Sequence, residues 1–170
     1  MEGSRPATAE DLPRIADLAE VARRELSPMK GGALWAAREA IAPPLEDAYA
    51  ALIGRDDALV VVGTFDDAVV GFGAVTLERL RTGDTLGVVT DLFVEDEARA
   101  VGVGEAMAEA LVAFCRAKQC VGIDALALPG HRAAKNFFEG EGFTARALVM
   151  HRPLADGGED GGGEDAAGQP

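Results

Sequence analysis

The feature that most constrains the fold is a glycine-containing turn between an apolar stretch and an amphipathic one. Residues 88–94 read VVTDLFV, a run typical of a buried strand, and residues 99–104 read RAVGVG. Apolar residues then recur at helical spacing, which predicts a helix over residues 103–118. Glycine lets the backbone approach a ligand closely, and the first N–H groups of a helix have no intrahelical partner. The turn is therefore suited to binding phosphate, although these residues alone fit a tight strand-to-helix connection equally well.

The other predicted elements are short, and helical patterns alternate with strand-like ones. The helices are predicted over residues 8–26, 33–42, 45–53 and 132–139, and the strands over residues 59–65, 69–77, 86–94, 122–128 and 143–152. The strand, helix and strand at 86–94, 103–118 and 122–128 form a crossover unit, so those two strands should be parallel. The hairpins add antiparallel strands. We therefore predict an α+β (mixed α/β) fold with a central mixed sheet and flanking helices.

Length and composition favour one domain over residues 1–154. Residues 155–170 consist largely of glycine, alanine and acidic residues with no large apolar side chain, so we expect a disordered tail there. The net charge of −13 argues against binding to nucleic acid or to an anionic membrane surface. It favours a cationic substrate such as an amine, although acidity that only keeps the protein in solution is the simpler explanation.

The cysteines exclude several other classes. Cys115 and Cys120 are too few for a disulfide framework, and their spacing fits no zinc site, so no metal is expected. Cys115 falls on the apolar face of the helix after the turn and should be buried. No apolar run has the length of a membrane span, and the N-terminus lacks the apolar core of a signal peptide. A cytoplasmic protein is the default expectation.

Three motifs resemble the GCN5-related N-acetyltransferase (GNAT) family. The RAVGVG turn after LFV resembles the family's acetyl-CoA signature, the sequence from 4 to 15 looks like its first strand and helix, and KNFFEGEGF at 135–143 is similar to its FYExxGF motif. The resemblance implies that the parallel strand pair splays apart and that the pantetheine arm of acetyl-CoA lies in the gap. It also implies an acyltransferase that is often a homodimer.

The resemblance further implies which residues contact acetyl-CoA. Backbone amides of Leu92, Phe93 and Val94 would hold the pantetheine arm. The pyrophosphate would lie against the turn made by Arg99, Ala100, Val101, Gly102, Val103, Gly104 and Glu105. Asn136 is a further candidate for a cofactor contact, or a residue that only faces water.

The catalytic positions depart from the family pattern. Phe138 stands where the family's tyrosine acid would be, and the apolar Leu126 matches the glutamate base of the ribosomal-protein alanine acetyltransferases. Asp91 is then the best candidate to receive the amine proton, because its segment TDLFV resembles the EDFFV of spermidine/spermine acetyltransferases; a strand-end carboxylate bonded to a nearby loop is the alternative. His131 titrates near neutrality and could act as acid or base, or could simply begin a helix. Glu78 is a weaker candidate.

Three functions fit these observations. The leading one is an N-acetyltransferase that moves an acetyl group from acetyl-CoA to a primary amine of a small molecule or protein. The alternative is a non-catalytic acyl-CoA-binding sensor on the same fold, because Phe138 and Leu126 cannot exchange protons. A generic nucleotide-phosphate binder fits less well, since no Walker lysine follows the glycines.

Overall fold

The computed structural model describes residues 1–154, and the predicted acidic tail at 155–170 lies outside the described residues. Five strands form one sheet in the order β1-β2-β3-β4-β5, in which β4 and β5 are parallel and the other neighbours antiparallel. The strands are β1 (Glu2–Pro6), β2 (Ala58–Phe65), β3 (Ala68–Arg79), β4 (Thr85–Val94) and β5 (Gly122–Ala125). The predicted mixed sheet and its parallel pair are confirmed.

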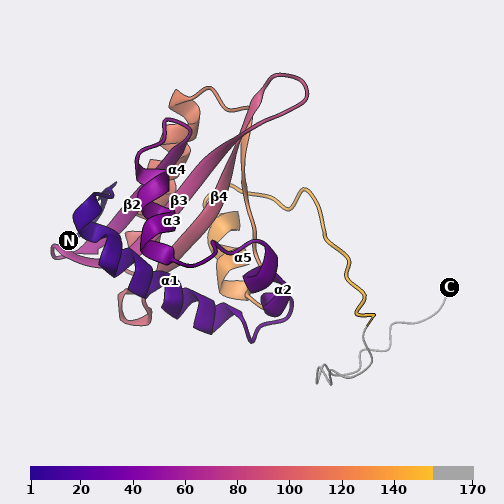
Figure 1. Ribbon diagram of the computed structural model, residues 1–170, viewed down its shortest axis with the longest axis horizontal. Helices are drawn as coiled ribbons and strands as arrows, with labels where there is room; N and C mark the ends of the chain where they lie inside the picture. The colour runs from indigo at the N-terminus through magenta and orange to yellow at the C-terminus, as the bar shows by residue number, and fades with distance from the viewer. Residues whose placement is uncertain (155–170) are drawn as a thin grey trace.

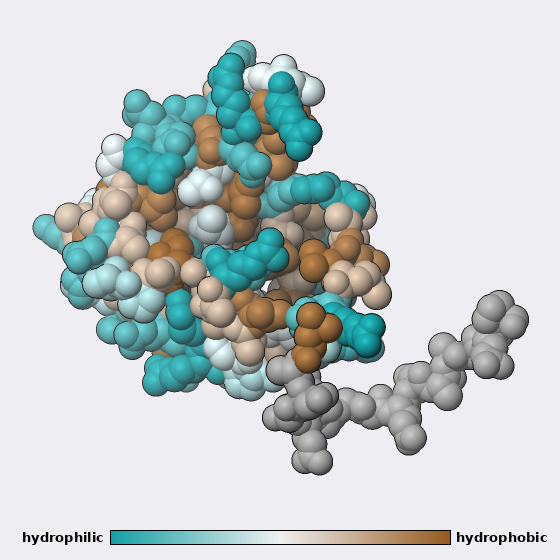
Figure 2. Space-filling model, turned by 45° about the vertical axis from the view of Figure 1, so that its right-hand side comes forward, coloured by the Kyte–Doolittle hydropathy of each residue, from teal (hydrophilic) through white to brown (hydrophobic). Residues whose placement is uncertain are grey.

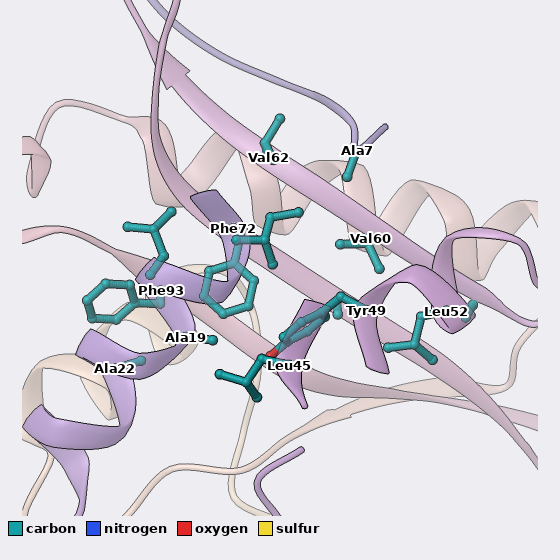
Figure 3. Close-up of a cluster of buried hydrophobic side chains, with 14 residues drawn as sticks. Ala7, Ala19, Ala22, Leu45, Tyr49, Leu52, Val60, Val62, Phe72 and Phe93 are labelled. Carbon is teal, nitrogen blue, oxygen red and sulfur yellow. The ribbon is translucent and has the colours of Figure 1, made fainter. Parts of the chain in front are cut away.

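Helices cover both faces of the sheet (Figure 1). They are α1 (Leu12–Leu26), α2 (Gly32–Arg38), α3 (Leu45–Ile53), α4 (Val103–Ala117) and α5 (Arg132–Gly140), with short 3-10 helices η1 (Ala9–Asp11) and η2 (Asp96–Ala98). The side chains of successive β2 residues point to opposite faces of the sheet, because side chains alternate along a strand. Val60 and Val62 join the core under α1 and α3 (Figure 3), whereas Val61 joins the core under α4. Both faces are buried, which explains why β2 is apolar without alternation.

Helix α4 packs closely on the sheet because glycine faces it on β2. A Cβ atom added to Gly63 would lie 2.5 Å from Cγ1 of Val103 and 2.8 Å from the sulfur of Met107. Any side chain there would push the first turns of α4 outward. Cys115 on the same helix is 3% exposed, as its position on the apolar face predicted.

Several predicted boundaries differ from the structure. The prediction of a strand over residues 143–152 is wrong, since residues 143–154 carry no regular secondary structure. A strand needs a neighbouring backbone to pair with, and no strand of the described chain pairs with this segment. Strand β5 ends at Ala125 rather than at residue 128, because its ladder with β4 stops there. Helix α2 ends at Arg38 rather than at residue 42.

No helix within residues 1–154 has both the length and the apolar character needed to cross a membrane.

Candidate active site

A β-bulge in β4 shapes the centre of the site. Val89 pairs with Val75 on β3 and Asp91 pairs with Ala74, which leaves Thr90 without a partner. A bulge bends its strand and turns side chains in new directions. The parallel ladder between β4 and β5 ends at the pair that contains Val89, one residue before the bulge. The two parallel strands therefore part just where Asp91 lies, as the splayed pair of the predicted fold requires.

A cavity of about 620 Å³ lies at this divergence. Its wall is formed by α1, α2, α3, the second half of β4, the turn before α4, and α5. The predicted site residues that line it are Asp91, Leu92, Phe93, Val94, Arg99, Ala100, Gly104, Glu105 and His131. Residues from α1 through α5 therefore meet at one hollow.

Four predicted cofactor residues do not line this cavity. Val101 and Gly102 lie in the turn outside it, and Val103, the first residue of α4, is buried against the sheet. Asn136 is exposed on α5, away from the cavity wall. The structure therefore does not bring Asn136 to the site, whereas the turn residues remain able to offer backbone amides. Glu78, the weaker catalytic candidate, is exposed on β3 and also lies outside the cavity.

Asp91 accepts hydrogen bonds from two hydroxyl groups. The Tyr49 hydroxyl donates to Oδ1 over 2.9 Å, and the Thr90 hydroxyl donates to Oδ2 over 3.0 Å. Burial raises the pKa of Asp91 to about 6, and these two hydrogen bonds partly oppose the rise. A carboxyl group that titrates near neutrality inside a cavity is typical of a residue that exchanges protons.

Tyr49 lies on α3 within the core, beside Phe72 (Figure 3), and its hydroxyl bonds Asp91 at the edge of that core. Its ring is 1% exposed and packs edge-on against Phe72 at 5.5 Å between centroids. Burial and the neighbouring Asp91 charge raise the pKa of the Tyr49 hydroxyl, so it remains a proton donor. The sequence did not identify Tyr49 as a partner of Asp91, because the two residues lie 42 positions apart on different elements. A buried phenol needs a hydrogen-bond partner, but that signal does not reveal which one.

The turn before α4 presents free amides. Gly102 has φ of +89° and Ala100 has φ of +64°, so the chain makes a left-handed turn directly before the helix. Ala106 donates the first helical hydrogen bond, to the carbonyl of Gly102, which leaves the amides of residues 103–105 without intrahelical partners. These donors, at the positive end of the helix, fit a pyrophosphate group.

Gly104 also brings α5 to the site. A Cβ atom at this position would lie 3.2 Å from Cε2 of Phe137, closer than most such contacts. Because Gly104 has no side chain, the backbone of the turn stays uncovered and Phe137 of α5 can pack against it. Phe138, beside Phe137, lines the cavity together with Leu126, and neither can donate or accept a proton.

Arg99, predicted to add charge near the pyrophosphate, is engaged by groups of the protein itself. It bonds Glu25 of α1 over 2.7 Å, Asp96 over 3.2 Å and the carbonyl of Val94 over 2.8 Å. Its guanidinium lies 5.4 Å from the centroid of Phe93. Arg99 therefore ties the end of β4 to α1 and closes one side of the cavity.

His131 occupies the residue before α5 and lines the cavity. Burial and the charge of Arg99 lower its pKa, against a smaller opposing effect of Glu25. His131 is therefore neutral at physiological pH and can accept a proton as well as donate one from its ring N–H. Within residues 1–154, no cluster of three or more histidine, cysteine or acidic side chains could bind a metal ion.

Comparison with known proteins defines the class. The model of the acetyltransferase (GNAT) family matches residues 20–143, most of the described chain. The protein belongs to this family, as the motifs of the sequence predicted. Membership supports acetyl transfer as its general chemistry and leaves the acceptor open. No curated protein sequence gave a match.

Solved structures share the fold at low sequence identity. A mutant of the BH1408 protein from Bacillus halodurans is 20% identical with a TM-score of 0.75, over 89% of this chain and 99% of that one. Glucosamine-6-phosphate N-acetyltransferase from Arabidopsis thaliana is 16% identical with a TM-score of 0.66, over 91% and 99%. An aminoglycoside acetyltransferase from an uncultured soil metagenomic sample, in complex with sisomicin, is 17% identical with a TM-score of 0.67, over 91% and 95%.

Proposed function

We propose that this protein transfers the acetyl group of acetyl-CoA to a primary amine, with Asp91 as the group that receives the amine proton. The observation that carries the proposal is the position of Asp91: it follows the bulge of β4, where the strands part, and its carboxyl group has a pKa of about 6. At neutral pH the carboxylate is largely ionised, so it can both attract a protonated amine and accept a proton from it.

The reaction needs little more from the protein. The amine nitrogen forms a bond to the acetyl carbonyl carbon, and the thioester C–S bond breaks. The proton lost by the nitrogen passes to Asp91, directly or through one water. The sulfur leaves as a thiolate and takes its proton from solvent, because Phe138 has none to give. Thiolate is a good leaving group, so a missing acid costs about the 10²-fold lower end of general-acid effects.

The turn before α4 would hold the pyrophosphate of acetyl-CoA. The free amides of residues 103–105 and the bare backbone at Gly102 and Gly104 support this assignment. Replacing Gly104 by valine should weaken acetyl-CoA binding tenfold or more, about 1.4 kcal/mol. Because valine also presses on Phe137, the matched control is Gly140→Val, outside the cavity, where an added Cβ would meet nothing within 4 Å; it should bind acetyl-CoA normally. Unchanged affinity of Gly104→Val by calorimetry would remove the turn from the binding site.

The acceptor end of the cavity lies between α1, α2 and α3, where Trp35, Glu39 and Tyr49 line the wall. Together with Asp91 these groups combine an aromatic surface with carboxylates, which favours a cationic amine over an anionic one. Both a small amine and an amine of a protein side chain fit this chemistry.

A non-catalytic acyl-CoA sensor is the second candidate, and one observation favours it. Phe138 and Leu126 both line the cavity, at the positions where related enzymes carry proton-exchanging side chains. Incubation with acetyl-CoA and a panel of amines, followed by measurement of free thiol, separates the two functions. Turnover that depends on an amine supports the enzyme. Tight acetyl-CoA binding without turnover over the whole panel supports the sensor and contradicts our proposal.

A further inference from the structure

The acceptor end of the cavity has walls that are mainly apolar. The apolar residues that line it on the side of α1, α2 and α3 include Ala22, Leu26, Trp35, Ile41, Leu45 and Phe72. Figure 2 shows a hollow near the centre of this face of the molecule, with apolar and hydrophilic residues around it. Walls of this kind favour an acceptor whose own body is apolar, because contact removes apolar surface from water on both sides.

The polar side chains among these walls already have partners within the protein. Tyr49 and Thr90 both donate their hydroxyl hydrogens to Asp91. Arg23 donates to the carbonyl of Ile41 over 2.6 Å. An acceptor with a hydroxyl group on most of its carbon atoms, such as a sugar, would lose its hydrogen bonds to water here and regain few of them.

The unbalanced charge of the acceptor end is negative and lies mainly at one point. Asp91 is half-buried and has no basic side chain bonded to it, since its two hydrogen-bond donors are hydroxyl groups. Glu39, which also lines the cavity, is exposed and lies 3.6 Å from the guanidinium of Arg38. One ammonium group beside Asp91 therefore satisfies the charge of this end, and the indole of Trp35 offers a face for a ring.

A backbone contact closes the cavity on one side. The turn at residues 27–31, which joins α1 to α2, meets the loop at residues 128–130, which leads into α5: a Cβ atom added to Gly130 would lie 3.5 Å from the backbone nitrogen of Lys30. Figure 1 shows α2 and α5 side by side at this place. A peptide cannot lie across the cavity here without breaking the contact, so the enclosure favours a small acceptor.

We infer that the acceptor is a small primary amine on an apolar body of about one ring, that is, an arylalkylamine. Its ammonium group lies against Asp91, and its ring lies against Trp35 and the apolar side chains of α1 and α3. The inference rests on the proposed acetyl transfer for the use of this pocket by an acceptor. Binding of the amine can nevertheless be measured without turnover, which separates the two.

The first test is binding, with Trp35 as the reporter, because it is the single tryptophan of the chain and lines the cavity. The full chain with coenzyme A present is titrated with 2-phenylethylamine, with 2-phenylethanol, which has the same ring and no charge, and with glucosamine, which has an amine on a hydroxylated ring. The phenylethylamine should bind about tenfold or more tightly than either. Equal or tighter binding of the alcohol or the sugar overturns the inference, and so does an unchanged Trp35 emission with the phenylethylamine.

The second test changes the walls. Leu26→Gln and Ile41→Asn each place a polar group on a half-buried position of the cavity lining, and each should weaken binding of 2-phenylethylamine about tenfold. The matched control is Leu34→Gln, which lies next to the reporter, is 50% exposed and does not line the cavity; it should bind as the wild type does. Wild-type affinity in both wall variants overturns the inference.

The third test is thiol release from acetyl-CoA with 2-phenylethylamine and with glucosamine, and it distinguishes failure of this inference from failure of the proposed function. Faster turnover with the phenylethylamine supports both. Turnover with glucosamine alone retains acetyl transfer and overturns the acceptor class. Tight binding of 2-phenylethylamine with no turnover of any amine retains the arylalkylamine pocket and overturns acetyl transfer.

Discussion

Asp91→Asn is expected to stabilise the folded protein while it removes activity. Burial raises the pKa of this carboxyl from its ordinary 3.8 to about 6. Each pH unit between the two values corresponds to 1.36 kcal/mol, so the ionised carboxylate costs the folded state about 3 kcal/mol at pH 8. Asparagine has nearly the same shape, accepts the Tyr49 hydrogen bond through its carbonyl oxygen, and carries no charge.

The sign of the pH dependence is fixed by the direction of the shift. A carboxyl group whose pKa is raised in the folded state binds its proton more tightly there than in the unfolded chain. The favourable contribution of protonated Asp91 to the free energy of unfolding is therefore complete below pH 3.8, and it is lost as the pH rises through 6. The variant should therefore match the wild type near pH 4 and exceed it by up to about 3 kcal/mol at pH 8. For a chain of this size that difference is a rise in Tm of roughly 6–12 °C.

Thermal unfolding of both proteins at pH 4, 6 and 8 measures the stability difference, and steady-state kinetics with the best acceptor measures turnover. Turnover of Asp91→Asn should fall about 10²-fold or more, as expected for loss of a general base. His131→Ala, on the same cavity, is the control and should lose far less. A difference in Tm that does not grow with pH would refute the burial argument, and full activity of Asp91→Asn would transfer the role of base to His131.

Three further outcomes follow from the same structure. Tyr49→Phe removes a hydrogen bond that lowers the pKa of Asp91, so the acid limb of the kcat/KM profile should move to higher pH while activity at pH 9 stays near wild type; an unmoved limb would show that Tyr49 only fills space. The Arg5 guanidinium bonds Asp11 and lowers the pKa of its carboxyl to about 2. The contribution of this pair to the free energy of unfolding is therefore present above pH 3.8 and lost as the pH falls toward 2. Asp11→Asn should cost about 1–2 kcal/mol at pH 7 by urea unfolding, and less below pH 3. Phe138→Tyr should keep or raise turnover in the thiol-release assay, and a large loss would mean that the hydroxyl disturbs the cavity.

The turn and helix of the proposed cofactor site could be predicted from sequence because their information is local. The turn at 99–104 and the helix that follows are contiguous, so the spacing of Gly102 and Gly104 already indicated exposed amides at a helix start. The parallel pairing of β4 with β5 followed from one crossover rule. In the first case the deciding residues are contiguous, and in the second they belong to one continuous strand–helix–strand unit.

The surroundings of Asp91 could be predicted only in part. Asp91 was identified from its neighbours in sequence, but its pKa depends on Tyr49, which lies 42 residues earlier on another helix. The bulge at Thr90 was not visible either, because it results from the register between β3 and β4. Asn136 was assigned to the cofactor from its position beside the FYExxGF-like motif, and the structure places it on the exposed side of α5.

The failed strand prediction after α5 has a different cause. The pattern from Leu148 to Met150 is that of a strand, but the structure leaves this stretch without regular secondary structure. Pairing, however, is a property of two backbones, and a single sequence specifies only one of them.

The energetic cost of Asp91 connects stability to the choice of acceptor. A fold that keeps a carboxylate where ionisation costs about 3 kcal/mol is under strain at neutral pH unless a cation comes near. Arg23 and Arg99 are the basic side chains of the cavity wall, and each is bonded to other groups: Arg23 to the carbonyl of Ile41, Arg99 to Glu25. A protonated amine that enters the cavity supplies the missing positive charge, lowers the pKa of Asp91 and relieves the cost. Ionisation of Asp91 and binding of a cationic acceptor therefore favour each other, whereas a neutral or anionic acceptor gains nothing from this carboxylate.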